Sequence, residues 1–411
     1  MKKTICLVTN WYPTKDNPYA GAFFKEQAFS VSDDFDFIIF RYKEHLRKLP
    51  WKRNSAAIVN KEKNTIEYDV DVYVPVYLYF SDVIHNMVVK ITRKNMVDGI
   101  GKYVSPRRHA YTRKHIVNIF KSVINTIPDC FYCVDAQSEA FWLQCLAEHF
   151  DRPYVVGEHA PVPWPGSLIK DIDKYAIEKA DLFLAISNDK IRQMLLQNIK
   201  LPKTVYIGNL IDEEKLETTN KTADHVKTFI IIAANSFYKN YDLFIKMMSL
   251  LKKIANKPFK VMIVGYAANK GYSKNVEEFE NKIRQSDFAD VTQMIPEVPH
   301  EQIGQVLGQA DAFVMTSIQE GQPVSAMEAA CCGLPVFSTR CGGIEDYVTD
   351  DIGRIYAVTD YEGMANGLND YLEGKITFDS EYIRSQMVAK FGNEAFRKNF
   401  KETFNKVIKN A

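Results

Sequence analysis

The stretch AFVMTSIQEGQPVSAMEAACCGLPV, residues 312–336, contains a strand, a loop and a helix in that order. Residues 312–315 are apolar and predict a buried strand. Gly321 in the polar loop allows a close backbone approach. Pro323 suits the first turn of a helix, where its missing N–H costs nothing, and Gly333 suits the end of that helix. This order predicts one unit of a doubly wound α/β sheet.

Two carboxylates, Glu320 and Glu328, flank the predicted start of this helix. The free N–H groups at a helix start form a site for anionic oxygens. A carboxylate accepts two hydrogen bonds from vicinal hydroxyls, as an acidic residue does for ribose in dinucleotide sites. The arrangement therefore suits a ligand with hydroxyls on both sides of a diphosphate, and a nucleotide sugar is such a ligand.

Outward from this stretch, short apolar runs alternate with helical patterns. The candidate strands are residues 4–9, 35–40, 131–134, 154–156, 182–186, 228–233, 259–264, 312–315 and 335–337. The candidate helices are residues 136–150, 166–180, 241–255, 276–286, 300–308 and 322–332. Continuous apolar strands between helices predict parallel sheets covered on both faces. We expect two Rossmann-like domains facing a central cleft, with ligands at the carboxyl ends of the strands.

The break in this pattern defines the expected domains. Residues 1–208 form the first Rossmann-like, acceptor-side domain, and the polar stretch 209–227 is a linker. Residues 228–385 form the second, donor-binding domain. Residues 386–411 form a C-terminal helical segment that is a candidate to cross back to the first domain.

Composition excludes several classes of protein. The chain has 411 residues and a formal net charge of +1, so its net charge gives no electrostatic field that would attract nucleic acid. No apolar run reaches the roughly 18 residues of a transmembrane helix, and residues 1–10 predict a strand rather than a signal peptide. A cytosolic location is therefore expected. The seven cysteines, an odd number, suggest reduced thiols. Cys130 and Cys133 form a C-x-x-C pair without the second pair that tetrahedral zinc needs.

Residues 41–115 carry more basic than acidic side chains. One interpretation is a solvated face with loops. The other is a patch that meets anionic lipid headgroups or a lipid-diphosphate acceptor, and Trp51 among the basic residues favours it slightly.

The string from Glu320 to Val336 resembles the E-x7-E signature of family 4 glycosyltransferases, the retaining enzymes of GT-B fold and glycosyl transferases group 1 type. The resemblance implies that Glu320 contacts the donor sugar and that Glu328 binds the nucleotide ribose. It also implies that the residues after Glu320 bind the donor, namely Gly321, Gln322, Pro323 and Val324.

Further matches run along nearly the whole chain. Gly21 matches the family's first strand-to-helix turn, where it lets the backbone approach the donor phosphates, or it only relieves a turn. His159, in Gly-Glu-His-Ala, matches a loop that contacts the donor sugar, or it only satisfies backbone groups. Lys239 matches a lysine that neutralises the leaving diphosphate, or it is a solvated surface lysine. Gly342 and Gly343 match a second glycine loop for the donor.

One departure from the family concerns charge at the diphosphate. The arginine that accompanies the lysine has no counterpart, because Ala233, Ala234 and Asn235 occupy the region. The resemblance implies retention of configuration without a metal, and the nucleotide-diphosphate sugar is a co-substrate rather than a cofactor. The acceptor is expected to be a glycan or a lipid-linked glycan in bacterial surface polysaccharide assembly, reached at the inner face of the membrane. Two alternatives stay open: a nucleotide-sugar epimerase on the same fold, and an inactive nucleotide-sugar-binding partner.

Overall fold

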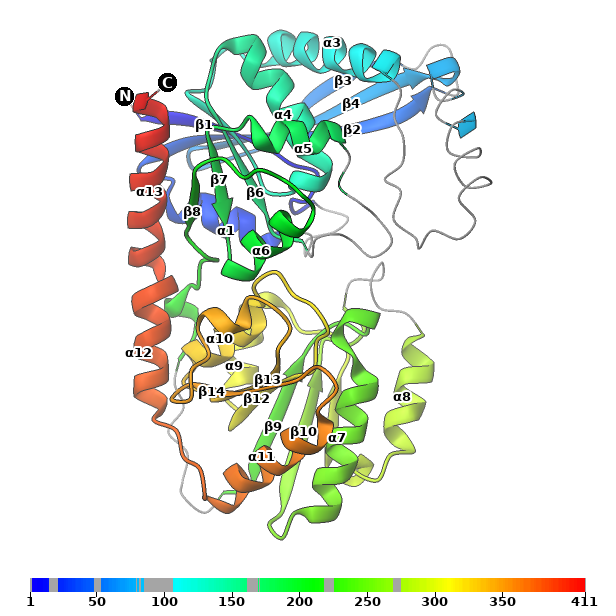
Figure 1. Ribbon diagram of the computed structural model, residues 1–411, viewed down its shortest axis with the longest axis vertical. Coiled ribbons are helices and arrows are strands. Elements are labelled where there is room, and N and C mark those ends of the chain that lie inside the picture. Colours follow the sequence, from blue (N-terminus) through cyan, green and yellow to red (C-terminus); the bar gives the residue numbers. More distant parts are fainter. Residues whose placement is uncertain are drawn as a thin grey trace. The chain divides into compact units, whose positions relative to one another are not determined.

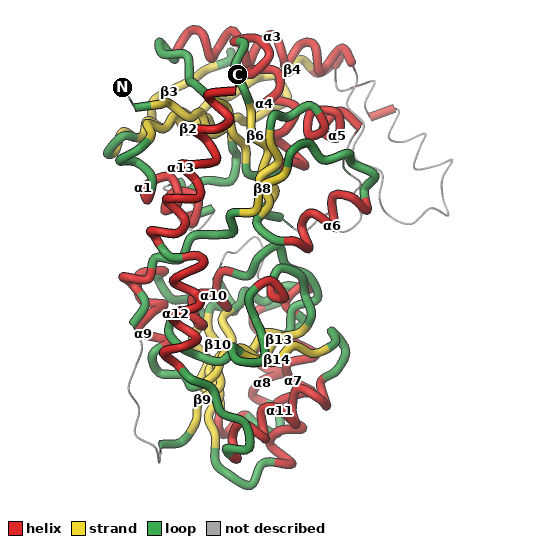
Figure 2. The backbone as a smooth tube through the Cα atoms, turned by 60° about the vertical axis from the view of Figure 1, so that its left-hand side comes forward, coloured by secondary structure: helices red, strands yellow, loops and turns green. Residues whose placement is uncertain are grey.

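The computed structural model describes residues 2–14, 21–47, 53–78, 80, 83–84, 106–160, 169, 171–217, 225–268 and 275–410. Contacts within the chain divide it into two compact units. The first unit is Met1–Ile207 with Arg397–Ala411, and the second is Gly208–Phe396. Figure 2 shows that the strands of each unit lie among helices.

The described part of the first unit contains an eight-stranded sheet in the order β3-β4-β2-β1-β5-β6-β7-β8. Neighbouring strands run parallel except β3 and β4, which are antiparallel. The strands are β1 (Lys3–Val8), β2 (Phe35–Arg47), β3 (Ser55–Glu62), β4 (Thr65–Pro75), β5 (Cys130–Cys133), β6 (Tyr154–Glu158), β7 (Leu182–Ala185) and β8 (Thr204–Tyr206). The order grows outward from β1 on both sides, as in a doubly wound sheet.

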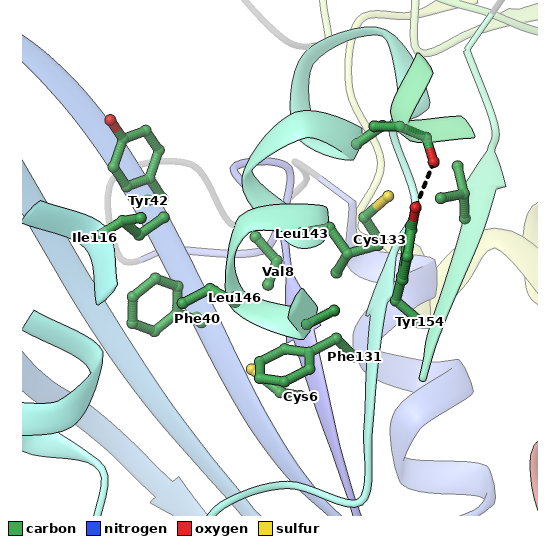
Figure 3. Close-up of a cluster of buried hydrophobic side chains, with 14 of the residues drawn as sticks. Cys6, Val8, Phe40, Tyr42, Ile116, Phe131, Cys133, Leu143, Leu146 and Tyr154 are labelled. Carbon is green, nitrogen blue, oxygen red and sulfur yellow. Dashed lines mark hydrogen bonds between the residues drawn. The ribbon is translucent and has the colours of Figure 1, made fainter. Parts of the chain in front are cut away.

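Helices surround this sheet (Figure 1). They are α1 (Ala22–Ser30), α3 (Pro106–Val123), α4 (Ala136–Phe150), α5 (Asp171–Glu178), α6 (Asn188–Leu196) and most of α13 (Asn393–Asn410). Figure 3 shows the core on one face, where Val8, Phe40 and Phe131 of three strands meet Leu143 and Leu146 of α4. Because these large side chains leave water, their burial is the main favourable contribution to folding.

Helix α13 covers part of the other face of the same sheet. The rings of Phe400 and Phe404 stack with centroids 4.2 Å apart, and both lie against Phe35 of β2. Asp34 binds Lys401 at 2.6 Å and Arg397 at 2.7 Å. Residues 397–410 are thus held in the first unit by an apolar stack and by ion pairs.

The described part of the second unit contains a six-stranded sheet in the order β11-β10-β9-β12-β13-β14. All its neighbouring strands run parallel. The strands are β9 (Lys227–Ile232), β10 (Phe259–Val264), β11 (Thr292–Ile295), β12 (Ala312–Met315), β13 (Val336–Thr339) and β14 (Gly353–Tyr356).

Helices cover both faces of this second sheet. They are α7 (Tyr241–Ile254), α8 (Val276–Arg284), α9 (Ile303–Leu307), α10 (Val324–Cys331), α11 (Tyr361–Glu373) and α12 (Ser380–Phe391). The unit also contains short 3₁₀ turns, which are η1 (Glu213–Lys215), η2 (Phe237–Lys239), η3 (Ala289–Val291), η4 (His300–Gln302) and η5 (Ile344–Asp346). Phe229 and Ile231 of β9 pack with α7, α8 and α11, while Ile230 between them is equally buried. Alternate residues point to opposite faces of a strand, so both faces of the sheet are covered.

The predicted α/β class with parallel sheets is confirmed, but several strands were missed. Those strands are β3, β8, β11 and β14. Pro323 is the extended residue just before α10 rather than a residue of its first turn. The stretch expected as a linker, 209–227, contains η1, and its residues 218–224 lie outside the described residues.

Candidate functional site

Three neighbouring strands of the second unit, β9, β12 and β13, end at one edge of their sheet. The loops that follow them contain Lys239, Glu320 and Gly343, all predicted site residues. Parallel strands bring their carboxyl ends together, and this is the edge at which open α/β sheets bind ligands.

The structure pairs Lys239 with Glu320. The ammonium Nζ lies 2.6 Å from carboxylate Oε1, and the side chains are 26% and 14% exposed. The backbone around the pair is fixed, since Thr316 Oγ1 donates to the carbonyl of Lys239 at 2.9 Å and the amide of Ile318 donates to the carbonyl of Tyr238 at 2.7 Å. A cation and an anion from two separate loops therefore meet at the edge of the sheet.

The two glycine loops pack directly against each other. Gly342 and Gly343 have φ angles of 89° and 68°, which side-chain-bearing residues rarely adopt. A Cβ on Gly343 would lie 2.2 Å from the carbonyl oxygen of Gly321. The amide of Glu320 also donates to the carbonyl of Cys341 at 2.6 Å. Glycine at position 343 thus allows the loop that holds Glu320 to close against its neighbour.

Glu328 lies in the middle of α10 and is buried. Its Oε1 is 2.9 Å from Nε2 of His300 in η4. The sequence analysis did not include His300 among the site residues. A histidine directly after Pro299, in the segment that follows β11, was the available signal.

Gln322 is buried and forms hydrogen bonds with the chain near the start of the second unit. Its Oε1 accepts a hydrogen bond from the amide of Asn209 at 2.5 Å, and Nδ2 of Asn209 donates to its carbonyl at 3.2 Å. Pro323, next in sequence, is also buried and its carbonyl accepts from the hydroxyl of Tyr347 at 3.4 Å. Donor binding by Gln322, Pro323 and Val324 stays a prediction.

In the first unit, Gly21 starts α1 with a φ of 63°. A Cβ at this position would lie 2.3 Å from the carbonyl oxygen of Trp11. The turn therefore requires glycine for its own geometry. Phosphate approach at Gly21 stays a prediction.

His159, after β6, is buried at the carboxyl end of the first sheet. Its amide donates to the carbonyl of Val134 at 3.1 Å. Its ring meets the ring of Phe24 edge-on, with centroids 4.6 Å apart, and Phe23 lies at 5.6 Å. The imidazole is thus held among aromatic side chains of α1.

Buried charges lie behind this loop. Glu158 accepts hydrogen bonds from the amides of Ala160 at 2.7 Å and Gln137 at 3.2 Å, and Nζ of Lys190 donates to the carbonyl of Ala160. Burial raises the pKa of Glu158 to about 8 and lowers the pKa of Lys190 to about 8. Burial also raises the pKa of Glu139, whose Oε1 accepts from the amide of Asn10 at 2.5 Å. The hydrogen bonds of these buried groups connect the loops that follow the carboxyl ends of the strands in the first sheet.

The basic region is structured where it is described. Arg41 binds Glu67 and Asp69, Arg108 binds Glu44, and Arg113 binds Glu148. These three arginines are therefore paired with carboxylates of the same unit. Trp51, which slightly favoured the membrane interpretation, lies outside the described residues, as do Lys48 and Lys52 beside it.

The cysteines are all reduced and buried. Burial raises the pKa of both Cys130 and Cys133 well above the ordinary value. Within the described ranges, no group of three or more histidine, cysteine, aspartate or glutamate side chains is placed to hold a metal ion. In the same ranges, no helix is both long and apolar enough to span a bilayer.

Against known proteins, the second unit gives the clearest match. Residues 212–394 match the family model of the glycosyl transferases group 1. This group 1 segment contains Lys239, Glu320, Glu328 and the Gly342–Gly343 loop. The match to group 1 is thus carried by the unit in which these predicted residues are brought together.

Two curated relatives match stretches of this chain that are longer than the group 1 segment. The chain is 25% identical over 302 residues to lipopolysaccharide 1,6-galactosyltransferase of Escherichia coli K12, covering 72% of this chain and 78% of that protein. It is 25% identical over 226 residues to the gpi3 component of phosphatidylinositol N-acetylglucosaminyltransferase of Schizosaccharomyces pombe, covering 53% and 48%. The chain thus spans about half the length of this second relative.

Solved structures show the fold of the whole chain. The apo form of the lipopolysaccharide outer core galactosyltransferase WaaB matches 98% of this chain and 99% of its own, with a TM-score of 0.68 and 15% identity. The Anabaena protein HepE in complex with UDP and glucose matches 98% and 100%, with a TM-score of 0.65 and 14% identity. The chain has the GT-B architecture of these glycosyltransferase structures.

Proposed function

We propose that this protein is a retaining glycosyltransferase that moves a sugar from a nucleotide-diphosphate sugar to a hydroxyl acceptor. The observation that carries the proposal is the meeting of Lys239 and Glu320 beside the Gly342–Gly343 loop, at the ligand-binding edge of the sheet. These residues lie in the segment that matches the group 1 family.

In the proposed reaction the bond between the anomeric carbon and the diphosphate oxygen breaks. The acceptor hydroxyl oxygen bonds to the same face of that carbon, and its proton passes to the departing diphosphate. The electron pair of the broken bond leaves with the diphosphate, so Lys239 faces developing negative charge. A preorganised cation in such a place stabilises the transition state.

The remaining residues bind or orient the donor in this proposal. Glu320 accepts hydrogen bonds from the sugar hydroxyls once Lys239 turns to the diphosphate, and Glu328 accepts from the ribose. Gly21 lets the backbone of the first unit approach the phosphates, and His159 contacts the sugar. No metal is required, because Lys239 and backbone N–H groups hold the diphosphate.

The acceptor is proposed to be a growing surface polysaccharide or its lipid-linked precursor, with the enzyme at the cytoplasmic face of a bacterial membrane. The relatives support the acceptor class, since one is named for lipopolysaccharide and the other for phosphatidylinositol. Basic side chains of residues 41–115 are proposed to meet the anionic surface.

A second candidate is an inactive nucleotide-sugar-binding partner. The absence of the family's arginine, where Ala233, Ala234 and Asn235 stand, favours it. Binding would persist in such a protein because Glu328 and the glycine loops do not depend on that arginine.

A two-stage measurement separates these functions. Nucleotide sugars are first screened by thermal shift, since a ligand that binds the folded state raises its melting temperature. Each donor that binds is then incubated with the protein, with and without glycan acceptors, and release of the nucleoside diphosphate is measured. Transfer or donor hydrolysis supports the transferase, and binding without either supports the inactive partner. A wild-type protein that binds no nucleotide sugar contradicts both.

A further inference from the structure

His300 and Glu328 come from different elements of the second unit, and the partly exposed histidine meets the buried glutamate. His300 opens η4, after β11, and Glu328 is in α10, 28 residues later. Nε2 of His300 lies 2.9 Å from Oε1 of Glu328, with side chains 37% and 11% exposed. The carboxylate is thus the more buried partner of the pair.

A buried carboxylate stays charged only when hydrogen-bond donors replace the water it loses. Arg384 of α12 lies near the end of α10, but its guanidinium is directed away from Glu328. It donates to the carbonyls of Cys331, Leu216 and Glu213. Within the described residues, His300 is the side chain that the structure bonds to the carboxylate of Glu328. The bond requires a proton on Nε2, which both the neutral and the charged imidazole can carry.

The bond occupies one oxygen of the carboxylate and fixes its plane. The terminal torsion of glutamate is otherwise broad, so an unheld carboxylate samples many orientations. His300 is itself held, because the amide of Gln302 donates to the carbonyl of Pro299 at 2.9 Å and Ile303 is buried. With one acceptor site of Oε1 taken by His300, Oε2 and the second acceptor site of Oε1 are left for the hydroxyls of a ligand.

We propose that His300 is a positioning residue for ribose recognition: it holds the carboxylate of Glu328 in the orientation that accepts hydrogen bonds from the hydroxyls of a nucleoside diphosphate. This inference rests on the proposed function, in which Glu328 binds the donor ribose. It assigns to His300 the discrimination between ribose and deoxyribose at this site.

The test compares ribose and deoxyribose ligands by calorimetry. The probes are the nucleoside diphosphate that the wild type binds and its 2′-deoxy and 3′-deoxy forms. Wild type is expected to prefer the ribose form. His300→Ala should bind the ribose form about 10-fold more weakly than wild type does, as expected for the loss of a hydrogen bond to a charged group. For the deoxy form that wild type binds poorly, the affinity of His300→Ala should stay close to the wild-type value.

Three variants make the result specific to positioning. His300→Gln restores a side-chain N–H near the place of Nε2 and should recover most of the ribose preference. In a Glu328→Ala background, His300→Ala should cause no further loss, since the two act as one unit. Gln302→Ala, an exposed neighbour in the same turn, is the matched control and should bind like wild type.

The outcomes separate this inference from the function beneath it. Equal weakening of the ribose and deoxyribose forms by His300→Ala overturns the inference and leaves the transferase proposal standing. Additive losses in the double variant overturn it as well. A wild-type protein that binds no nucleoside diphosphate overturns the proposed function and the role of His300 together.

Discussion

The ammonium of Lys239 lies 2.6 Å from the carboxylate of Glu320, so two side chains with different proposed partners bind each other in this structure. At 26% and 14% exposure the pair is partly desolvated, and separating it without replacement would leave a buried charge uncompensated. In the proposed function a donor replaces both partners at once, with phosphate oxygens for the lysine and sugar hydroxyls for the glutamate. A nucleoside monophosphate or a free sugar would replace fewer of them, so the proposal predicts that the pair favours the intact donor.

Lys239→Ala should lower turnover by roughly 100- to 1000-fold, the usual effect of removing one preorganised donor to a developing charge. Donor affinity should change less, because the charge on the diphosphate grows in the transition state. The measurement is turnover at saturating donor and acceptor, with Lys246→Ala, an exposed lysine of α7, as control. If Lys239→Ala keeps most of its turnover, the leaving group is stabilised by other residues.

Activity should persist in excess EDTA, because Lys239 and backbone N–H groups are proposed to hold the diphosphate. The assay is transfer or donor hydrolysis before and after dialysis against the chelator. Activity that disappears and returns with Mg²⁺ or Mn²⁺ would contradict the metal-independent reaction.

Gly343→Ala should destabilise the second unit and disturb the loop of Glu320. Its Cβ would meet the carbonyl oxygen of Gly321 at 2.2 Å, in addition to the strain of a φ of 68°. Gly374→Ala is the matched control, since it has a φ of 81° but no atom within 4 Å of the added Cβ. The control should lose only the ~1 kcal/mol of a left-handed alanine. Equal losses of unfolding free energy in denaturant would show that the contact with Gly321 is unimportant.

The free energy of unfolding should fall as pH rises from about 4.5 to about 8, through the contribution of Glu158. Burial raises its pKa from 4.5 to about 8, so the folded state binds the proton more tightly than the unfolded state in this range. Lys190, with a pKa lowered to about 8, acts in the opposite sense, and its contribution to stability recovers as pH rises above 8 toward 10.5. Denaturant unfolding at several pH values should show a shallower fall in Glu158→Gln than in wild type. The exposed Glu148→Gln should keep the wild-type slope, and an unchanged slope in both variants would contradict the assignment to Glu158.

The protein should sediment with anionic liposomes at low salt and dissociate as salt is added. Arg53 and Arg107 are exposed basic residues of the region, and each charge near an anionic surface contributes about 1 kcal/mol. Reversing both to glutamate should reduce binding strongly, whereas reversing the exposed Lys253 and Lys260 of the second unit should not. Absence of wild-type binding at low salt would favour the solvated-face interpretation.

Much of the architecture was predictable because buried parallel strands leave a clear pattern. β10 and β12 were predicted at their observed bounds, and α4 likewise, because uninterrupted apolar runs and helical periodicity report burial directly. The missed strands are less apolar. β3 is largely exposed and β11 is half-buried at an edge of its sheet, so neither needs a continuous apolar sequence.

At the site, the sequence predicts which residue types stand at the ends of the strands and where glycine is needed. It could not determine the partners of the charged side chains. Lys239 lies 81 residues from Glu320, and His300 lies 28 residues from Glu328. Hydrogen bonds and ion pairs act over a few ångströms, and the strand order decides which distant loops come within that reach. Tertiary structure therefore decided that Lys239 and Glu320 neutralise each other, and that a histidine stands beside the glutamate proposed to bind ribose.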